Sequence, residues 1–167
     1  MTGIMKCFDA KVLKGEEVLM VEENLTSASI EKATDESEIR NGAENGIWGV
    51  FNTNDKLTVT MESNVISLQR LQLLAGIEPD ENPTEIVIKE GQYPTTVELE
   101  LTSVFINDKG EVEKLVEISI PKAKPSASWS LTTSSSYTDG NNSTITFTAQ
   151  KDESGNLAYI RFTDPEA

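Results

Sequence analysis

The chain is organised around residues 39–77, which read IRNGAENG (39–46), IWGVFNTNDKLTVTMES (47–63) and NVISLQRLQLLAGI (64–77). The first segment concentrates Gly and Asn and predicts an irregular loop, because these residues tolerate tight backbone reversals. In the second, apolar and polar residues alternate from Leu57 to Glu62, which predicts a strand. We expect residues 52–55 to turn the chain between this strand and another at 47–51. In the third, leucines recur at helical spacing and predict a helix that ends at Gly76.

Further strand patterns extend over the rest of the chain. We expect strands at 6–13, 17–21, 25–33, 86–88, 95–106, 111–120, 128–133, 145–149 and 157–163. At 167 residues the chain has the length of a single domain, 1–167. The residues after the proline-flanked stretch 121–125 are too few for a second core. The pattern predicts a mostly β fold, an antiparallel β-sandwich or partly closed barrel with one short flanking α-helix.

The order of loop, strand pair and short helix resembles the major tail tube protein of tailed bacteriophages. Members of that family often carry a Glu-Ile-Arg-Gly-Gly-like loop, a strand pair with an Asn-Asp/Lys-Lys turn, and a short amphipathic helix. The matching positions are Glu38, Ile39, Arg40, Gly42, Asn45, Gly49, Asn54, Lys56, Leu57, Val59, Thr60, Leu68 and Leu71. Asn41 stands where the family usually has a glycine.

The resemblance implies a function as well as a fold. It implies a structural virion protein, a subunit of the phage tail tube whose self-assembly gives stacked hexameric rings around a channel for DNA ejection. The implied partners are other copies of the chain, a tape-measure protein and a tail-terminator protein, while DNA passes through without tight binding. The implied location is the virion tail, after synthesis and assembly in the host cytoplasm.

Charge is the strongest compositional feature. The chain has 28 Asp and Glu against 14 Lys and Arg, for a net charge of −14. Proteins that bind nucleic acid tightly place a surplus of Lys and Arg against phosphates, so the composition argues against tight binding to DNA or RNA. Carboxylates that line a channel would instead repel passing phosphates. Charge alone equally fits a plain acidic protein, and only the family resemblance favours the channel.

Three segments are candidates for contact between subunits. The polar segment 34–46 is longer than an ordinary connection and a second polar excursion covers 134–142, so we assign both to subunit contacts. The run 18–21 is apolar on both faces, which indicates the core on one side and a neighbouring subunit on the other. The predicted interface residues are Ile39, Arg40, Asn41, Gly42, Asn45 and Trp48.

A negatively charged strand pair is the candidate channel lining. From residue 97 to 101 apolar residues alternate with glutamates, so one face of that strand is apolar and the other anionic. The turn at 107–110 joins it to a return strand that begins with two more glutamates. The predicted channel-lining residues are Glu98, Glu100, Glu111 and Glu113. A solvated outer face is the alternative interpretation for any one of them.

The residues that usually carry chemistry are scarce. The chain has no histidine and one cysteine, Cys7, which we interpret as a small packed residue. Phosphate-binding glycine loops and nucleophile elbows are absent. We therefore expect no enzyme activity, no cofactor and no metal. No apolar run is long enough to span a bilayer, so we expect no membrane insertion.

Two alternative functions remain open from the sequence. One is an immunoglobulin-like binding module on a virion, for example a domain that binds carbohydrate or a cell surface. Aromatic residues make up 6% of the chain, which supplies few side chains for the groove of such a module. The other is the inner tube subunit of a contractile injection system, which would share the fold and differ in what passes through.

Overall fold

The described part of the chain forms one antiparallel sheet and one short helix. The computed structural model describes residues 3–40, 42, 46–65, 67–132 and 142–165. The strands are β1 (Gly3–Met5), β2 (Asp9–Lys14), β3 (Glu17–Glu22), β4 (Leu25–Arg40), β5 (Ile47–Ser63), β6 (Val97–Asn107), β7 (Val112–Pro125), β8 (Leu131–Thr132), β9 (Asn142–Ala149) and β10 (Tyr159–Thr163). The predicted fold class is confirmed: the chain is mostly β and antiparallel, with one flanking helix.

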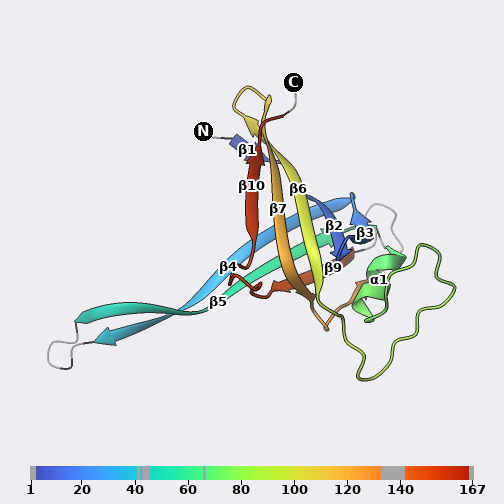
Figure 1. Ribbon diagram of the computed structural model, residues 1–167, viewed down its shortest axis with the longest axis horizontal. Helices are drawn as coiled ribbons and strands as arrows, with labels where there is room; N and C mark the ends of the chain where they lie inside the picture. The colour runs from blue at the N-terminus through green and yellow to red at the C-terminus, as the bar shows by residue number, and fades with distance from the viewer. Residues whose placement is uncertain (1–2, 41, 43–45, 66, 133–141, 166–167) are drawn as a thin grey trace.

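The ten strands belong to a single sheet that bends on itself (Figure 1). Its main path runs β3-β2-β6-β7-β9-β5-β4, while β1 pairs with β6, β10 with β7, and β8 with β9. The bend lies at the end of β7, where only residues 123–125 pair with β9. Within the described ranges no pairing joins the end strands β3 and β4, so the sheet is not closed into a barrel.

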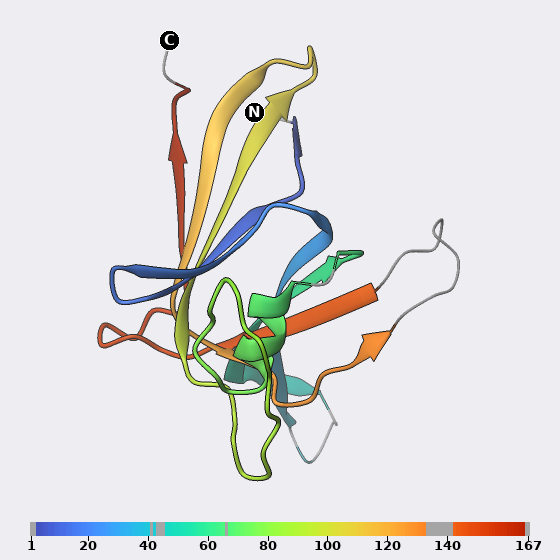
Figure 2. The same cartoon turned by 90° about the vertical axis from the view of Figure 1, so that its right-hand side faces the viewer.

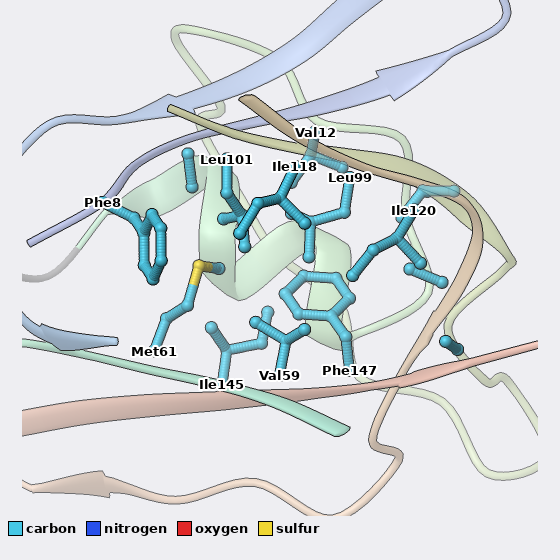
Figure 3. Packing of buried hydrophobic residues seen from close by; sticks show 14 of the residues in the cluster. Phe8, Val12, Val59, Met61, Leu99, Leu101, Ile118, Ile120, Ile145 and Phe147 are labelled. Carbon is cyan, nitrogen blue, oxygen red and sulfur yellow. The ribbon is translucent and has the colours of Figure 1, made fainter. Parts of the chain in front are cut away.

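The bend brings two halves of the sheet face to face around one hydrophobic core (Figure 3). On the strands that line this core, alternate residues point inward and are apolar, as the period of two requires. The side chains from β2, β6 and β7 that meet those from β5 and β9 include Val12, Leu99, Leu101, Ile118, Ile120, Val59, Met61, Ile145 and Phe147. Each of these nine side chains is at most 3% exposed.

The helix α1 (Leu68–Leu74) lies where the leucine spacing predicts it. Ser67 caps its first turn, since the Ser67 hydroxyl accepts a hydrogen bond from the Arg70 amide at 3.4 Å. The chain leaves the helix at Gly76 with a φ of +78°, a conformation that favours glycine. A Cβ on Gly76 would come within 2.7 Å of the Tyr93 carbonyl oxygen, so close packing also requires glycine there.

The hairpin of β4 and β5 differs from the sequence prediction. The loop expected at 34–46 is wrong for residues 34–40, which continue β4 to a length of 16 residues. The turn expected at 52–55 is wrong as well, because β5 runs unbroken over 17 residues. Asn54 has a φ of +55° within a bulge, where the register shifts between Ala33 and Asp35. The turn-forming residues therefore produce a bulge inside a long strand.

Beyond this bulge the hairpin leaves the body of the protein. We call residues 35–40 and 46–53 the arm; Figure 1 shows them extending away from the bent sheet. The strand expected at 86–88 is also wrong, because residues 75–96 form an irregular segment between α1 and β6. Figures 1 and 2 show this segment on the α1 side of the molecule, away from the arm.

Three further local predictions have different outcomes. The turn at 107–110 ends at Gly110 with a φ of +83°, and the Asn107 side-chain oxygen accepts hydrogen bonds from the amides of Lys109 and Glu111. Cys7 was expected to be packed, and this is wrong: it is exposed, with its thiol 3.6 Å from the Leu25 carbonyl oxygen. Nearly all of the excursion at 134–142 lies outside the described residues.

Candidate functional site

The arm carries a row of exposed apolar side chains on its β5 strand. Ile47, Val50 and Phe51 are each more than half exposed, and Trp48 is 83% exposed. Val50 and Phe51 are consecutive residues of β5, paired with Glu38 and Ser37 of β4. Because successive side chains of a strand point to opposite faces, apolar side chains occur on both faces of the arm. Exposed apolar side chains gathered in this way mark interaction sites in folded proteins.

The two strands of the arm differ in charge. The β4 strand contributes Asp35, Glu36 and Glu38 against one cation, Arg40, whereas residues 47–54 of β5 contain no charged side chain. In sheets, charged residues on an edge strand discourage pairing with other chains. The β4 edge of the arm is thus protected by charge, and the β5 edge is not.

The backbone edges of the arm are open among the described residues. β9 pairs with β5 only along residues 58–63, so residues 47–57 of β5 have β4 on one side and no described strand on the other. β4 is the last strand of the path and has an open edge along its whole length. Unpaired backbone groups on such edges form a template for strand addition.

Polar contacts fix the bulge at the base of the arm. The Thr34 hydroxyl donates to the Asp55 carboxylate at 2.7 Å, and the side-chain amide of Asn54 donates to the Asp35 carboxylate at 3.1 Å. The Lys32 ammonium lies 3.8 Å from the same Asp55 carboxylate. These contacts tie β4 to β5 on either side of the bulge and set the direction in which the arm leaves the body.

The structure brings part of the predicted interface together at the outer end of the arm. Ile39 and Arg40 end β4, and they pair with Gly49 and Ile47 next to Trp48. The Arg40 guanidinium donates to the Glu38 carboxylate at 2.6 Å. Gly42 is exposed in the turn between the two strands, while the predicted interface residues Asn41 and Asn45 lie outside the described residues.

The predicted channel glutamates fall in two places. Glu98 and Glu100 lie on the outer face of β6, where Glu100 pairs with Lys11 of β2 and Ser119 of β7. Glu111 and Glu113 lie at the far end of the β6–β7 hairpin, beside residues 105–107. The five residues of β6 from Glu100 to residue 105 span roughly 16 Å, so the pair Glu98 and Glu100 lies well away from the pair Glu111 and Glu113.

The outer face around Glu98 and Glu100 is of mixed charge. The Arg161 guanidinium of β10 donates to the Glu117 carboxylate of β7 at 2.9 Å on the same face.

The apolar run 18–21 lies on the edge strand β3. Val18 and Val21 are nearly half exposed, as the run that is apolar on both faces predicts, while Met20 is buried.

A buried ion pair that the sequence analysis missed holds α1 against the sheet. The Arg70 side chain is fully buried, and its Nε donates to the Glu22 carboxylate of β3 at 2.8 Å. Its Nη1 donates to the carbonyl oxygen of Ser143 on β9 at 2.8 Å. An arginine within a leucine stripe is the only signal in the sequence, because the partners lie 48 and 73 residues away. We interpret the pair as structural because both side chains are almost completely buried; Nη2 of Arg70 has no hydrogen-bond partner among the described residues.

Catalytic and ligand-binding features are sparse. Among the described residues, no group of three or more His, Cys, Asp or Glu side chains is placed to hold a metal ion. Within the same ranges, no helix has the length and hydropathy that crossing a membrane requires. The features that remain are the exposed strand edges and the exposed apolar side chains of the arm.

A bent antiparallel sheet with open strand edges and a projecting hairpin defines a β protein that can pair with further strands. Residues 77–160, half of the chain, match the model of the YomU/Tube protein family. The chain belongs to this family. No curated protein sequence matches the chain.

Two solved structures share the fold. One is the anti-feeding prophage cap, a tube-terminating cap, with a TM-score of 0.54 and 15% identity over 93% of this chain and 88% of that chain. The other comes from the sheath-tube complex of an extracellular contractile injection system in its extended state, with a TM-score of 0.53 and 13% identity over 94% of this chain and 89% of that chain. At these identities the likeness shows the fold.

The family and fold confirm the resemblance to a tail tube protein. The chain is a tube-type structural protein. The expectation that it is not an enzyme is also confirmed, because the family and both similar structures are structural tube or cap proteins.

Proposed function

We propose that copies of this chain assemble head to tail into hexameric rings, and that the rings stack into a hollow tail tube through which DNA passes. The observation that carries the proposal is the arm. Its apolar side chains and its backbone edges have no partner among the described residues of the same chain. A second copy of the chain can supply both.

The energetics favour an arm that is completed by another subunit. A two-stranded hairpin alone is marginally stable in water, and the arm extends past the point where β9 ends its pairing with β5. Fully burying a large apolar side chain stabilises by roughly 1.5–3 kcal/mol, so covering the exposed row on β5 contributes several kcal/mol per contact. Repeated around a ring and along a stack, such contacts support a filament.

The predicted interface residues fit this arrangement. Ile39, Arg40 and Trp48 lie together at the outer end of the arm, where a neighbouring subunit would be met first. We assign Gly42 to the same contact as the exposed turn residue of the arm, and keep Asn41 and Asn45 as predicted members. The exposed Val18 and Val21 on β3 are a second candidate contact, at the opposite end of the sheet path.

The proposed channel wall is the outer face of β6 with its neighbours. Glu98 and Glu100 give this face negative charge, and the chain as a whole carries a net charge of −14. A negative wall repels phosphates, so DNA slides past without binding. Lys11 and Arg161 moderate this charge locally. Glu111 and Glu113, at the end of the hairpin, are proposed to line the mouth of the channel.

The remaining implied partners follow from a tail tube. We include a tape-measure protein inside the tube and a tail-terminator protein at its end, with assembly in the host cytoplasm and the virion tail as final location. A second candidate function is the inner tube of a contractile injection system, because both similar solved structures come from tube or cap components of prophage-derived or injection particles. The two functions share the assembly and differ in cargo.

Electron microscopy of the purified protein at high concentration tests the proposal. We expect rings or tubes of uniform width with a central channel. The combined replacement of Arg40 and Trp48 by alanine is expected to leave the monomer folded and to abolish these particles. Val112→Ala, an exposed apolar position at the β6–β7 turn, is the matched control and is expected to assemble normally. A wild-type protein that stays monomeric under all conditions contradicts the proposal.

A further inference from the structure

The irregular segment between α1 and β6 contains a run with strong strand character. Residues 84–90 read TEIVIKE, and three consecutive β-branched residues, Ile86, Val87 and Ile88, favour a strand. Val87 is 44% exposed and Ile88 is 65% exposed. Local sequence and local structure normally agree in natural proteins, so a strand-like run outside any sheet indicates a missing partner.

The backbone of this run is also without partners among the described residues. The amide groups of residues 84–88 donate no hydrogen bond to a described residue, and the first carbonyl in the run that accepts one is that of Lys89, from the Gln92 amide at 3.3 Å. Unpaired backbone groups in a strand-like segment can be satisfied by addition to the edge of a sheet.

The two flanks of the segment are fixed, while the run itself is not. On one flank the Asp80 amide donates to the Gln72 side chain at 2.8 Å. On the other the Gln92 side chain donates to the Gly76 carbonyl oxygen at 3.0 Å, next to the close packing of Gly76 on Tyr93. Both anchors belong to α1 or its C-terminal end. The run is thus held between two fixed anchors, so only a short stretch of chain has to be ordered on binding.

We propose that residues 84–90 of one copy add as a strand to the open edge of β5 in the arm of a neighbouring copy. This inference rests on the proposed assembly and names the surfaces that meet in it. The arm and the 75–96 segment lie at opposite ends of the longest axis of the molecule (Figure 1). Two different surfaces at opposite ends are what a head-to-tail contact between identical subunits requires.

Charge selects the β5 edge over the β4 edge. The run carries Glu85, Lys89 and Glu90, a net negative charge. The β4 strand of the arm carries three carboxylates against one cation, Arg40, and this net negative charge repels the run. Residues 47–54 of β5 are uncharged and present exposed apolar side chains to pack against the β-branched run.

Proline replacement tests this strand directly. Successive amides of a strand point to opposite edges, so Val87→Pro and Ile88→Pro between them remove a donor on either side. Because no described residue accepts from these amides, we expect the thermal midpoint of the monomer to stay within about 2 °C, as suits an unstrained surface change. For at least one of the two variants we expect the protein concentration needed for tube assembly to rise by about tenfold or more.

Glu81→Pro is the matched control, at an exposed position of the same segment outside the run, and we expect it to assemble like wild type. If both run variants assemble at the wild-type concentration, the inference is overturned while the proposed tube stands. If the wild type itself forms no tube, the proposed function fails first. These two failures are therefore distinguishable.

Cross-linking identifies the edge that the run occupies. In a Cys7→Ser background, Val87→Cys is combined with Val50→Cys on the arm, or with Val18→Cys on the edge strand β3 as the control. A short bismaleimide should link the first pair into ladders of covalent oligomers in assembled tubes, because within one chain these positions lie at opposite ends of the molecule. Ladders from the Val18 pair alone would overturn the assignment to β5.

Discussion

The strand β5 is two regions in one. Near its C-terminal end Leu57, Val59 and Met61 are at most 9% exposed, whereas near its N-terminal end Val50 and Phe51 are each 53% exposed. The residue types are similar and the strand is continuous. The C-terminal part of β5 is paired with β9 and packs against the facing strands of the sheet, whereas the N-terminal part is covered by neither.

This difference separates what stabilises the subunit from what joins subunits. The covered half of β5 contributes to the free energy of folding of one chain. The bare half, the arm, contributes little until a second chain covers it, since an exposed apolar side chain remains in water. A substitution in the body should therefore change the stability of the monomer, and one in the arm should change assembly.

The largest effect is expected from a core residue on β9, the strand that pairs with the covered half of β5. Phe147→Ala on β9 empties a fully buried site, which typically costs about 3–5 kcal/mol of unfolding free energy. Phe51→Ala in the arm, the matched change, is expected to cost less than about 0.5 kcal/mol because its site is open to water. Urea denaturation of the monomer measures both. Equal decreases in unfolding free energy for the two variants would contradict the distinction between body and arm.

A similar contrast applies to charge. Arg70→Met leaves the buried carboxylate of Glu22 without its ion-pair partner, which is expected to cost about 3 kcal/mol. The control is Arg161→Met, which removes an ion pair with Glu117 in which both side chains are about half exposed, and solvent screening limits that loss to less than about 1 kcal/mol. Chemical denaturation near neutral pH separates them. A loss at Arg70 no greater than at Arg161 would show that α1 does not depend on the buried pair.

Sequence reasoning succeeded where one side of an element is buried by its own chain. Alternation from Leu57 to Glu62 gave the covered half of β5, and leucine spacing gave α1. It failed at 34–40, because a strand in water on both faces has no alternation to read. The residues 52–55 have turn chemistry that serves a bulge equally well, as the φ of Asn54 shows. The run at 86–88 has strand propensity, but a strand also needs a pairing partner from elsewhere in the chain, and the local sequence does not show whether one is present.

Part of the candidate site could be predicted from the sequence. Ile39, Arg40 and Trp48 were placed in one contact region from their position in the chain, and the structure brings them together at the end of the arm. That the region is a hairpin and not a loop depends on the pairing of β4 with β5. The Arg70–Glu22 pair joins residues 48 positions apart, and no local pattern carries such a contact.

The smallest effect is expected at the turn before β10. The Tyr159 hydroxyl donates to the Asp152 carboxylate at 2.6 Å and, with the Asn156 amide, lowers the pKa of Asp152 below its ordinary value of 3.8. A lowered pKa means that this contribution to stability is fully present above pH 3.8 and is lost as pH falls through the folded pKa. Asp152→Asn should therefore lose less thermal stability than wild type between about pH 5 and about pH 3.

Asp108→Asn in the β6–β7 turn is the control for that pH series. Its melting temperature should decrease with falling pH by the same amount as that of wild type. Parallel melting curves for wild type and Asp152→Asn would remove the role assigned to the Tyr159 hydrogen bond.

Hydrogen exchange along β5, measured in the monomer and in the assembled state, tests the central claim most directly. We predict that amides of residues 47–57 that point away from β4 exchange fast in the monomer and become protected on assembly, while those of residues 58–63 that point to β9 are protected in both. Fast exchange of the outer amides in assembled tubes, unchanged from the monomer, would contradict the claim that another subunit completes this edge.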